Sequence, residues 1–240
     1  MGKRRLGAMS HLPRLAVFDV DGTLIDSQHN IVSAMTAACR AHGIEQPAPE
    51  SVRRIIGLSL VEAVAALLPR NGHDDHLRVA HSYKEAFAES RRRHDPPEPM
   101  FPGAGEALAA LAADGWLLGI ATGKSRRGVA VMLERCCLEG AFVTIQTADG
   151  NPGKPHPAML LNAMDAVGGT AQRTVMIGDT TFDMQMARSA RTAAVGVAWG
   201  YHGVEELLAA GAEALVEHYR ALPEALAEAM RERECALAPP

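Results

Sequence analysis

The sequence predicts an α/β protein whose doubly wound parallel sheet is interrupted, after its first strand, by a helical insert. Beyond about residue 100, short apolar segments of strand length alternate with helical segments, which is typical of a parallel sheet covered on both faces. Between the first strand and this alternation, apolar residues recur only at helical spacing. Polar clusters also follow the predicted strands, at the edge where such sheets bind ligands. A Rossmann-like core with a separate helical domain accounts for all three observations.

The first predicted strand leads directly into the insert. Leu15 to Phe18 form a short apolar strand, and the polar run from Asp19 to Thr23 ends it. Apolar residues then follow a helical period from Ile31 until Gly43. Further helical segments are expected at 52–56, 60–68 and 76–93. We therefore expect residues 26–95 to form a helical domain.

A proline-rich run at residues 94–99 separates the insert from the rest of the core, because proline cannot continue a helix. Strands are then expected at 116–121, 141–145, 174–177 and 193–197. Helices are expected at 104–114, 125–137, 157–167 and 182–190, and again from Pro223 onward. The predicted core domain comprises residues 13–25 and 96–225, and residues 1–12 are expected to be a disordered leader.

Composition limits the classes of partner. The chain has 240 residues, a net charge of −4 and a pI near 6.2, which argue against nucleic acid or an acidic membrane as the main partner. No continuous apolar run reaches the roughly 18 residues of a membrane span. The 4 cysteines include no CxxC pair, so we expect free, buried thiols and a reducing cytoplasm. The expected partner is a small metabolite, and the protein is expected to be a monomer or a homodimer.

The first polar cluster, at residues 19–23, can supply acid, base and nucleophile. Asp19 and Asp21 are spaced by one residue, so both can face one site while Gly22 lets the chain turn. A carboxylate can attack phosphorus and form an acyl phosphate. A second carboxyl can give a proton to the leaving oxygen and take one from water. A simple turn or helix cap is the alternative interpretation.

Two further clusters offer groups that can bind phosphate. Thr122, Gly123 and Lys124 follow a predicted strand, and a hydroxyl with free backbone N–H groups at a helix N-terminus suits a phosphate. The alternative is a helix cap made by Thr122 or Ser125. Lys154 stands on rigid backbone between a glycine and a proline and can offer an ammonium to a phosphoryl group. An exposed surface lysine is the alternative there.

The last cluster places two acids four residues apart after the strand at 174–177. Asp179 falls in the loop and Asp183 in the first turn of the next helix. Magnesium takes oxygen ligands and usually one or two protein carboxylates, so this pair suits the ion. In the alternative interpretation, Asp179 caps the helix and Asp183 lies on its solvated face.

Taken together and in this order, the four clusters resemble the haloacid dehalogenase-like hydrolase superfamily. The pattern is Asp-x-Asp-Gly-Thr, a threonine after a strand, a Gly-Lys-Pro lysine and Gly-Asp-x-x-x-Asp. The resemblance runs from Leu15 to about Val216. The position of the insert is similar to the helical-cap subgroup that contains phosphoglycolate phosphatase and β-phosphoglucomutase.

The resemblance implies a role for each cluster. Asp19 would be the nucleophile and Asp21 the general acid and base, and the phosphoryl oxygens would be held by Thr122, Gly123 and Lys154. The metal ligands implied for Mg²⁺ are Asp19, the backbone carbonyl of Asp21, and Asp179, with Asp183 supporting the metal's water shell or Lys154. Electrostatics independently favours a cation, because each like-charged pair at about 4 Å costs on the order of 4 kcal/mol at an effective dielectric of 20.

We therefore expect a Mg²⁺-dependent phosphomonoester hydrolase that acts on a small metabolite, with phosphoglycolate as the first candidate. Asp21 supports this expectation, because the relatives that cleave phosphonates or remove halogens lack an acid at its place. A phosphosugar mutase, a pyrophosphatase or a nucleotidase of the same fold stays open. So does a catalytically silent phosphate-binding regulatory module.

The insert is expected to close over the substrate as a lid. Arg53, Arg54 and Gly57 form its best candidate for a loop that faces the substrate, because an arginine can bind a carboxylate with two hydrogen bonds. The alternative is that both arginines are solvated.

Overall fold

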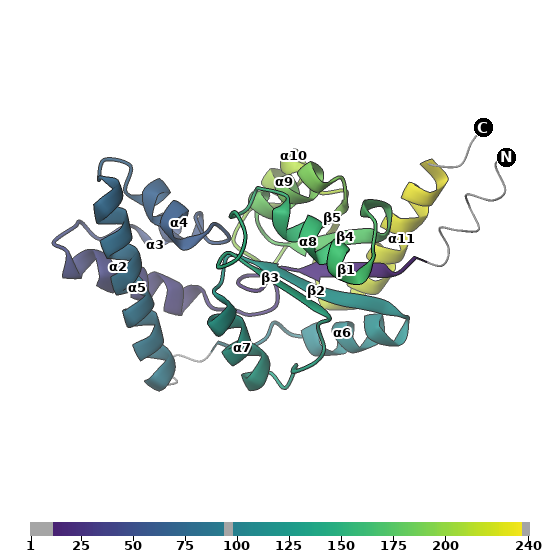
Figure 1. Ribbon diagram of the computed structural model, residues 1–240, viewed down its shortest axis with the longest axis horizontal. Helices are drawn as coiled ribbons and strands as arrows, with labels where there is room; N and C mark the ends of the chain where they lie inside the picture. The colour runs from purple at the N-terminus through teal and green to yellow at the C-terminus, as the bar shows by residue number, and fades with distance from the viewer. Residues whose placement is uncertain (1–11, 94–97, 237–240) are drawn as a thin grey trace.

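The computed structural model describes residues 12–93 and 98–236, and its core is a six-stranded parallel sheet in the order β3-β2-β1-β4-β5-β6 (Figure 1). From β1 the chain builds the sheet first toward β2 and β3, and then in the other direction toward β4, β5 and β6. The strand order therefore reverses beside β1, which is where ligands bind in open sheets of this kind. The α/β, doubly wound prediction is confirmed.

The strands largely match the predicted segments. Four agree to within a residue at either end, but β3 begins three residues later than the predicted start at Ala141, and the short edge strand β6 was missed because only Val216 in it is buried. The strands are β1 Arg14–Phe18, β2 Trp116–Thr122, β3 Thr144–Thr147, β4 Thr174–Gly178, β5 Ala193–Val197 and β6 Ala214–Val216.

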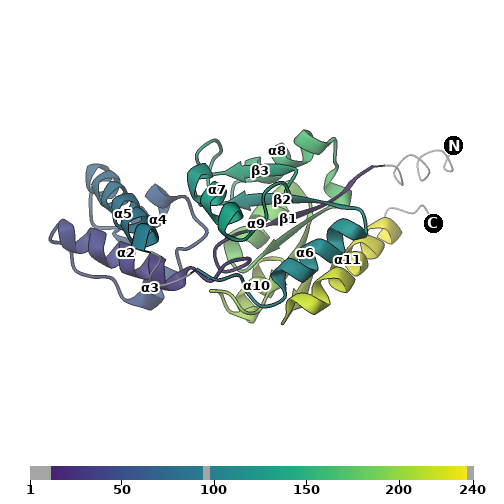
Figure 2. The same cartoon turned by 90° about the horizontal axis from the view of Figure 1, so that it is seen from below.

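Helices cover both faces of the sheet, as the alternating side chains of β1 require. Ala16 and Phe18 pack with one helical layer, and Leu15 and Val17 pack with the other. The first layer holds α6 Ala104–Ala113, α7 Arg126–Arg135 and α11 Leu222–Ala236, of which α6 and α11 lie side by side (Figure 2). The second holds α8 Ala158–Val167, α9 Thr181–Ala190 and α10 Val204–Ala210. Of these, α10 was not predicted.

The segment between β1 and α6 is helical and has a hydrophobic cluster of its own, which includes Ile31, Val64 and Val79. Its helices are α2 Gln28–Ala41, α3 Pro49–Arg53, α4 Leu60–Leu67 and α5 His73–Arg93. Helix α3 begins and ends three residues before the predicted helix at 52–56, and Pro49 suits its first turn. In Figure 1 this helical group lies to one side of the sheet.

Two predictions from composition can be compared with the structure. In the part of the chain that the structure describes, no helix has the length and apolar character needed to cross a bilayer. The expectation of buried thiols is right for Cys39, but Cys136 is only half-buried and Cys137 is exposed. The leader predicted at residues 1–12 lies, except for its last residue, outside the described residues, and so do residues 94–97 of the predicted hinge.

Candidate active site

Acidic side chains from three segments meet beside the carboxyl ends of β1 and β4. Asp19, Asp179 and Asp183 each place a carboxylate oxygen within 4.8 Å of the other two. The Lys154 ammonium joins this group, with Nζ 2.9 Å from Asp19 Oδ1 and 2.6 Å from Asp183 Oδ1. All four side chains are almost completely buried. Long-range folding thus gathers residues that are up to 164 positions apart in the chain.

The turn after β1 is held close to Asp179. Gly22 has a φ of +84°, and a Cβ built on it would lie 2.2 Å from Asp179 Oδ2, so only glycine fits. The hydroxyl of Thr23 donates a 2.8 Å hydrogen bond to Asp179 Oδ1. The close packing explains why Asp-x-Asp-Gly-Thr needs both its glycine and its threonine.

Asp179 receives a second hydrogen bond from a segment that sequence reasoning missed. The backbone N–H of Tyr201 donates to Asp179 Oδ2 at 2.9 Å. A Cβ on Gly200 would lie 2.1 Å from Asp179 Cβ, so this loop too passes directly over the carboxylate. The pKa of Asp179 is raised well above its usual value, first by burial and then by the charges of Asp19 and Asp183.

Asp183 and Lys154 form the inner side of the site. Asp183 Oδ2 accepts hydrogen bonds from the backbone N–H of Thr180 at 3.1 Å and from its hydroxyl at 2.7 Å, which completes a capping box at the start of α9. Burial alone would lower the pKa of Lys154, but the carboxylates of Asp183 and Asp19 outweigh it and raise the pKa. The alternatives of a solvated Asp183 and an exposed Lys154 are both wrong, because their side chains are 0% exposed.

Asp19 has one satisfied and one unsatisfied oxygen. Its Oδ1 accepts from the backbone N–H of Val20 at 2.7 Å and pairs with Lys154. Its Oδ2 is buried and has no hydrogen-bond partner among the described residues. Burial first, and then the charges of Asp183 and Asp21, raise the pKa of Asp19 to about 6 although Lys154 opposes them. A buried carboxylate oxygen without a donor, facing two further carboxylates, fits a bound divalent cation.

Thr122, the last residue of β2, does not cap the helix that follows it. Ser125 caps α7, because its side chain accepts a 3.1 Å hydrogen bond from the backbone N–H of Gly128. The helix cap that was the alternative interpretation is therefore made by Ser125 and not by Thr122. The Thr122 hydroxyl is buried and accepts from the backbone N–H of Lys124 at 3.2 Å.

Lys124 makes a contact that sequence reasoning did not assign. Its Nζ lies 2.5 Å from Asp21 Oδ1, and the Ser27 hydroxyl donates to the same oxygen at 2.6 Å. The Lys124 side chain is only 7% exposed. The only sequence signal for a role of Lys124 was its position next to Gly123 in the predicted phosphate-binding cluster. Its contact with Asp21 could not be predicted, because the two residues are 103 positions apart in the chain.

The helical group touches this loop through Gly57 and Leu58. A Cβ on Gly123 would lie 2.5 Å from the carbonyl oxygen of Leu58 and 2.9 Å from that of Gly57. Gly57 itself has a φ of +102° and lies close to Thr180. Of the three candidates in the insert, Gly57 is therefore beside the site.

The guanidinium groups of Arg53 and Arg54 bind elsewhere. Arg53 donates to Gln28 at 3.0 Å and to Glu50 at 3.2 Å. Arg54 pairs with Glu206 of α10 at 2.6 Å, on the protein surface. The structure does not bring either guanidinium to the carboxylate cluster.

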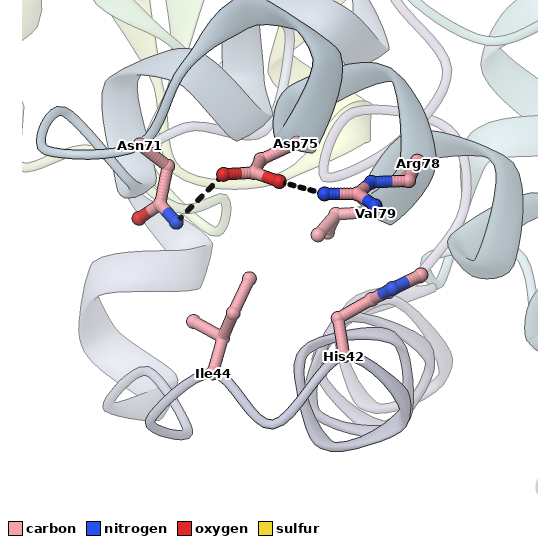
Figure 3. A pocket seen from close by; sticks show the side chains of 6 residues that line it. All are labelled: His42, Ile44, Asn71, Asp75, Arg78 and Val79. Carbon is pink, nitrogen blue, oxygen red and sulfur yellow. Dashed lines mark hydrogen bonds and ion pairs between the residues drawn. The ribbon is translucent and has the colours of Figure 1, made fainter.

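One pocket of about 160 Å³ lies entirely within the helical group, away from the predicted residues. Figure 3 shows that Asp75 binds both Asn71 and Arg78 along one side of it. Because these polar groups satisfy one another, the pocket offers no obvious ligand site. It is lined by His42, Ile44, Asn71, Asp75, Arg78 and Val79.

Residues 16–197 match the family model described as haloacid dehalogenase-like hydrolase. A protein of Dickeya dadantii named probable phosphatase IndB is 36% identical over 207 residues, which cover 85% of this chain and 90% of the relative. A phosphoglycolate phosphatase of Pseudomonas putida is 30% identical over 218 residues, which cover 88% of this chain and 79% of the relative.

Solved structures have the same architecture. The crystal structure of a hydrolase from Pseudomonas syringae superposes with a TM-score of 0.80 at 28% identity, covering 90% of this chain and 98% of the other. A predicted phosphatase from Clostridium acetobutylicum gives a TM-score of 0.81 at 23% identity, covering 90% and 99%, and so supports the fold alone.

Proposed function

The chain belongs to the haloacid dehalogenase-like hydrolase family and is a phosphatase; we propose that it is Mg²⁺-dependent and works through a covalent phosphate on Asp19. The observation that carries this proposal is Asp19 Oδ2, which has no hydrogen-bond partner among the residues that the structure describes and is buried near two other carboxylates and Lys154. An oxygen without a donor keeps its lone pairs for an attack on phosphorus. Carboxylate oxygens are also the ligands that a hard divalent cation such as Mg²⁺ prefers.

In the proposed first step, an Asp19 oxygen attacks phosphorus, and the bond between phosphorus and the leaving oxygen breaks. Asp21 gives its proton to that leaving oxygen, so the alcohol departs neutral. Lys154 and Thr122 hold the phosphoryl oxygens, and the backbone N–H group of Gly123 assists. Water then attacks phosphorus while Asp21 takes a proton from it. The bond between phosphorus and the Asp19 oxygen breaks, which releases inorganic phosphate and restores the Asp19 carboxylate.

The residues present fit a magnesium ion. We propose that Asp19, Asp179 and the backbone carbonyl of Asp21 hold it, while Asp183 orients Lys154. The ion would supply positive charge between the carboxylates and the substrate phosphate. Lys154 alone offers one positive charge, which is too little to balance the negative charges of the carboxylates and the phosphate. Lys154 meanwhile keeps Asp19 in place through its 2.9 Å contact.

We propose a small phosphorylated metabolite as the substrate, with phosphoglycolate as the first candidate. The Pseudomonas putida relative named phosphoglycolate phosphatase supports this choice. The helical insert, proposed here as a cap domain over residues 26–95, would close on the substrate, because its loop at residues 57–58 already contacts the loop at 122–124.

The test is phosphate release from p-nitrophenyl phosphate and 2-phosphoglycolate, with Mg²⁺ and with EDTA. We expect release only with Mg²⁺. Asp19→Asn should lower kcat by roughly a thousandfold or more, because an amide cannot act as the nucleophile. Asp165→Asn, which removes an exposed carboxylate of α8, is the matched control and should behave as the wild type.

A direct trap distinguishes the covalent route from direct attack by water. After rapid acid quenching with ³²P-labelled substrate, the wild-type protein should carry label that hydroxylamine removes, as expected for an acyl phosphate, and Asp19→Asn should carry none. Residual activity of Asp19→Asn within tenfold of the wild type would rule out Asp19 as the nucleophile.

A further inference from the structure

We propose that Lys124 is the residue that selects the substrate, by binding an anionic group on the leaving alcohol. This inference rests on the proposed function and deepens it, because it assigns a substrate class to the same site. The class is short phosphomonoesters whose leaving group carries a carboxylate close to the ester oxygen.

The position of Lys124 follows from its partner. Its Nζ lies 2.5 Å from Asp21 Oδ1, and Asp21 is the proposed acid at the leaving oxygen. Lys154 contacts Asp19 and Asp183 instead, which places it on the nucleophile side. The two buried lysines therefore divide the site, with Lys154 toward the phosphoryl group and Lys124 toward the leaving group.

Lys124 is also covered by the helical insert. Its Nζ lies 5.3 Å from the centre of the Phe87 ring of α5, within the range of a cation–π contact. The neighbouring Gly123 lies against the carbonyl groups of Gly57 and Leu58. A cation held between core and insert, away from water, binds an anion more strongly than an exposed lysine would.

Arg53 and Arg54, the two arginines predicted to face the substrate, do not supply this charge. Arg54 is paired with Glu206, and Arg53 with Gln28 and Glu50. Lys124 has three N–H donors, so it can bind a substrate carboxylate while it stays in contact with Asp21. In a phosphoglycolate-like ester, the carboxyl carbon is two bonds from the ester oxygen, which brings the carboxylate within reach of a lysine beside Asp21.

The experiment compares 2-phosphoglycolate with ethyl phosphate, which has the same chain length and no carboxylate. The readout is the ratio of the two kcat/KM values. We expect Lys124→Met to lower this ratio about tenfold to a hundredfold, the range for one charge-assisted hydrogen bond. Lys124→Arg should restore part of the ratio because it keeps the charge. Lys84→Met, which removes an exposed lysine of α5, should leave the ratio unchanged.

A second variant distinguishes two roles of Lys124, namely binding the substrate carboxylate and only holding Asp21 in place. Ser27→Ala removes another donor to Asp21 Oδ1 without a change of charge, so it should affect both substrates alike. If Lys124→Met also lowers both kcat/KM values in equal proportion, Lys124 only holds Asp21, and the proposal is overturned.

Binding provides a readout that does not need turnover. In the Asp19→Asn background, calorimetry should show that 2-phosphoglycolate binds more tightly than ethyl phosphate and that Lys124→Met removes the difference. If Asp19→Asn with Lys124 intact binds 2-phosphoglycolate and ethyl phosphate with equal affinity, the proposed role of Lys124 is overturned. A wild-type protein that hydrolyses neither ester would refute the proposed function instead, while the binding comparison still decides the role of Lys124.

Discussion

At the scale of single residues, the site is a set of buried charges that neutralise one another only in part. Asp19, Asp179 and Asp183 are fully buried around one ammonium, and Asp21 has a lysine of its own. Burial and mutual repulsion raise the pKa values of Asp19 and Asp179. Such an arrangement is unfavourable for folding and favourable for binding a cation and a phosphate.

Replacing Asp21 by asparagine tests proton donation at the leaving oxygen. We expect Asp21→Asn to slow hydrolysis of ethyl phosphate by about a hundredfold or more, because ethanol needs a proton in order to leave. Hydrolysis of p-nitrophenyl phosphate should suffer much less, since its leaving group has a low pKa. Steady-state kinetics on the two esters provide the measurement, and equal losses would remove Asp21 from the role of acid.

Magnesium binding should depend on pH through Asp19. Its pKa is raised to about 6, so protons compete with the cation below that value. An acid with a raised pKa stabilises the fold only while protonated, so in the metal-free protein this contribution is present below about pH 4 and is lost as the pH rises through about 6. We expect Mg²⁺ to raise Tm more at about pH 8 than at about pH 5.

Thermal unfolding with and without MgCl₂ at the two pH values measures this effect. In Asp19→Asn the Mg²⁺-dependent rise in Tm should be small at both. An equal rise in the wild type at both pH values would contradict the assignment of Asp19 as a ligand.

At the scale of elements, two loops bring the helical insert onto the sheet. The loop after β2 meets the loop between α3 and α4 through backbone atoms, at Gly123 and Leu58. On the other side, Arg54 pairs with Glu206 of α10, and the His202 ring lies 3.2 Å from the Arg54 carbonyl oxygen. Burial lowers the pKa of His202, and its other ring nitrogen accepts from the backbone N–H of Thr181 at 3.1 Å. His202 therefore joins α9 to the insert.

Gly123→Ala should prevent this close approach. Its Cβ would lie 2.5 Å from the Leu58 carbonyl oxygen, so the insert must move away. We expect kcat/KM to fall roughly tenfold to a hundredfold, because small displacements of positioning groups are costly in catalysis. Tm should change little, since the contact joins two loops and involves none of the buried residues of the hydrophobic clusters.

The control is Gly150→Ala, where a Cβ would meet nothing within 4 Å. Kinetics and thermal unfolding of the two variants provide the comparison. Wild-type kinetics in Gly123→Ala would show that the loop contact is not needed for turnover.

At the scale of the whole molecule, apolar residues form three clusters, two on the faces of the sheet and one inside the helical group. Val79 belongs to the third cluster and Val175 to one of the first two, and both are 0% exposed. We propose that the helical group is a separate domain that opens independently of the core.

Val79→Ala and Val175→Ala test this division by hydrogen exchange. Each substitution removes two buried methyl groups and should cost about 2 kcal/mol, which corresponds to roughly thirtyfold faster exchange in the unit that contains it. Val79→Ala should accelerate exchange within residues 26–93 and spare β1, β2 and β4. If exchange rises equally throughout the chain, the protein is one cooperative unit.

Local sequence patterns were sufficient for most of the fold. Apolar periodicity placed β1, β2, β4 and β5, because a strand buried on both faces needs a continuous apolar run. The same rule failed at β6, where two of three residues are only half-buried, and at the start of β3. An edge strand need not be apolar throughout, so its sequence carries a weaker signal.

By itself, the sequence determined the α/β class, the helical insert and the acids and lysine that could serve a phosphatase, since these follow from local spacing and residue chemistry. Tertiary structure alone decided which charges meet. Lys124 pairs with Asp21 across 103 positions, and Arg54 pairs with Glu206 across 152 rather than with the site. The physical reason is that such contacts depend on strand order and on the packing of the insert against the core, which no local pattern encodes.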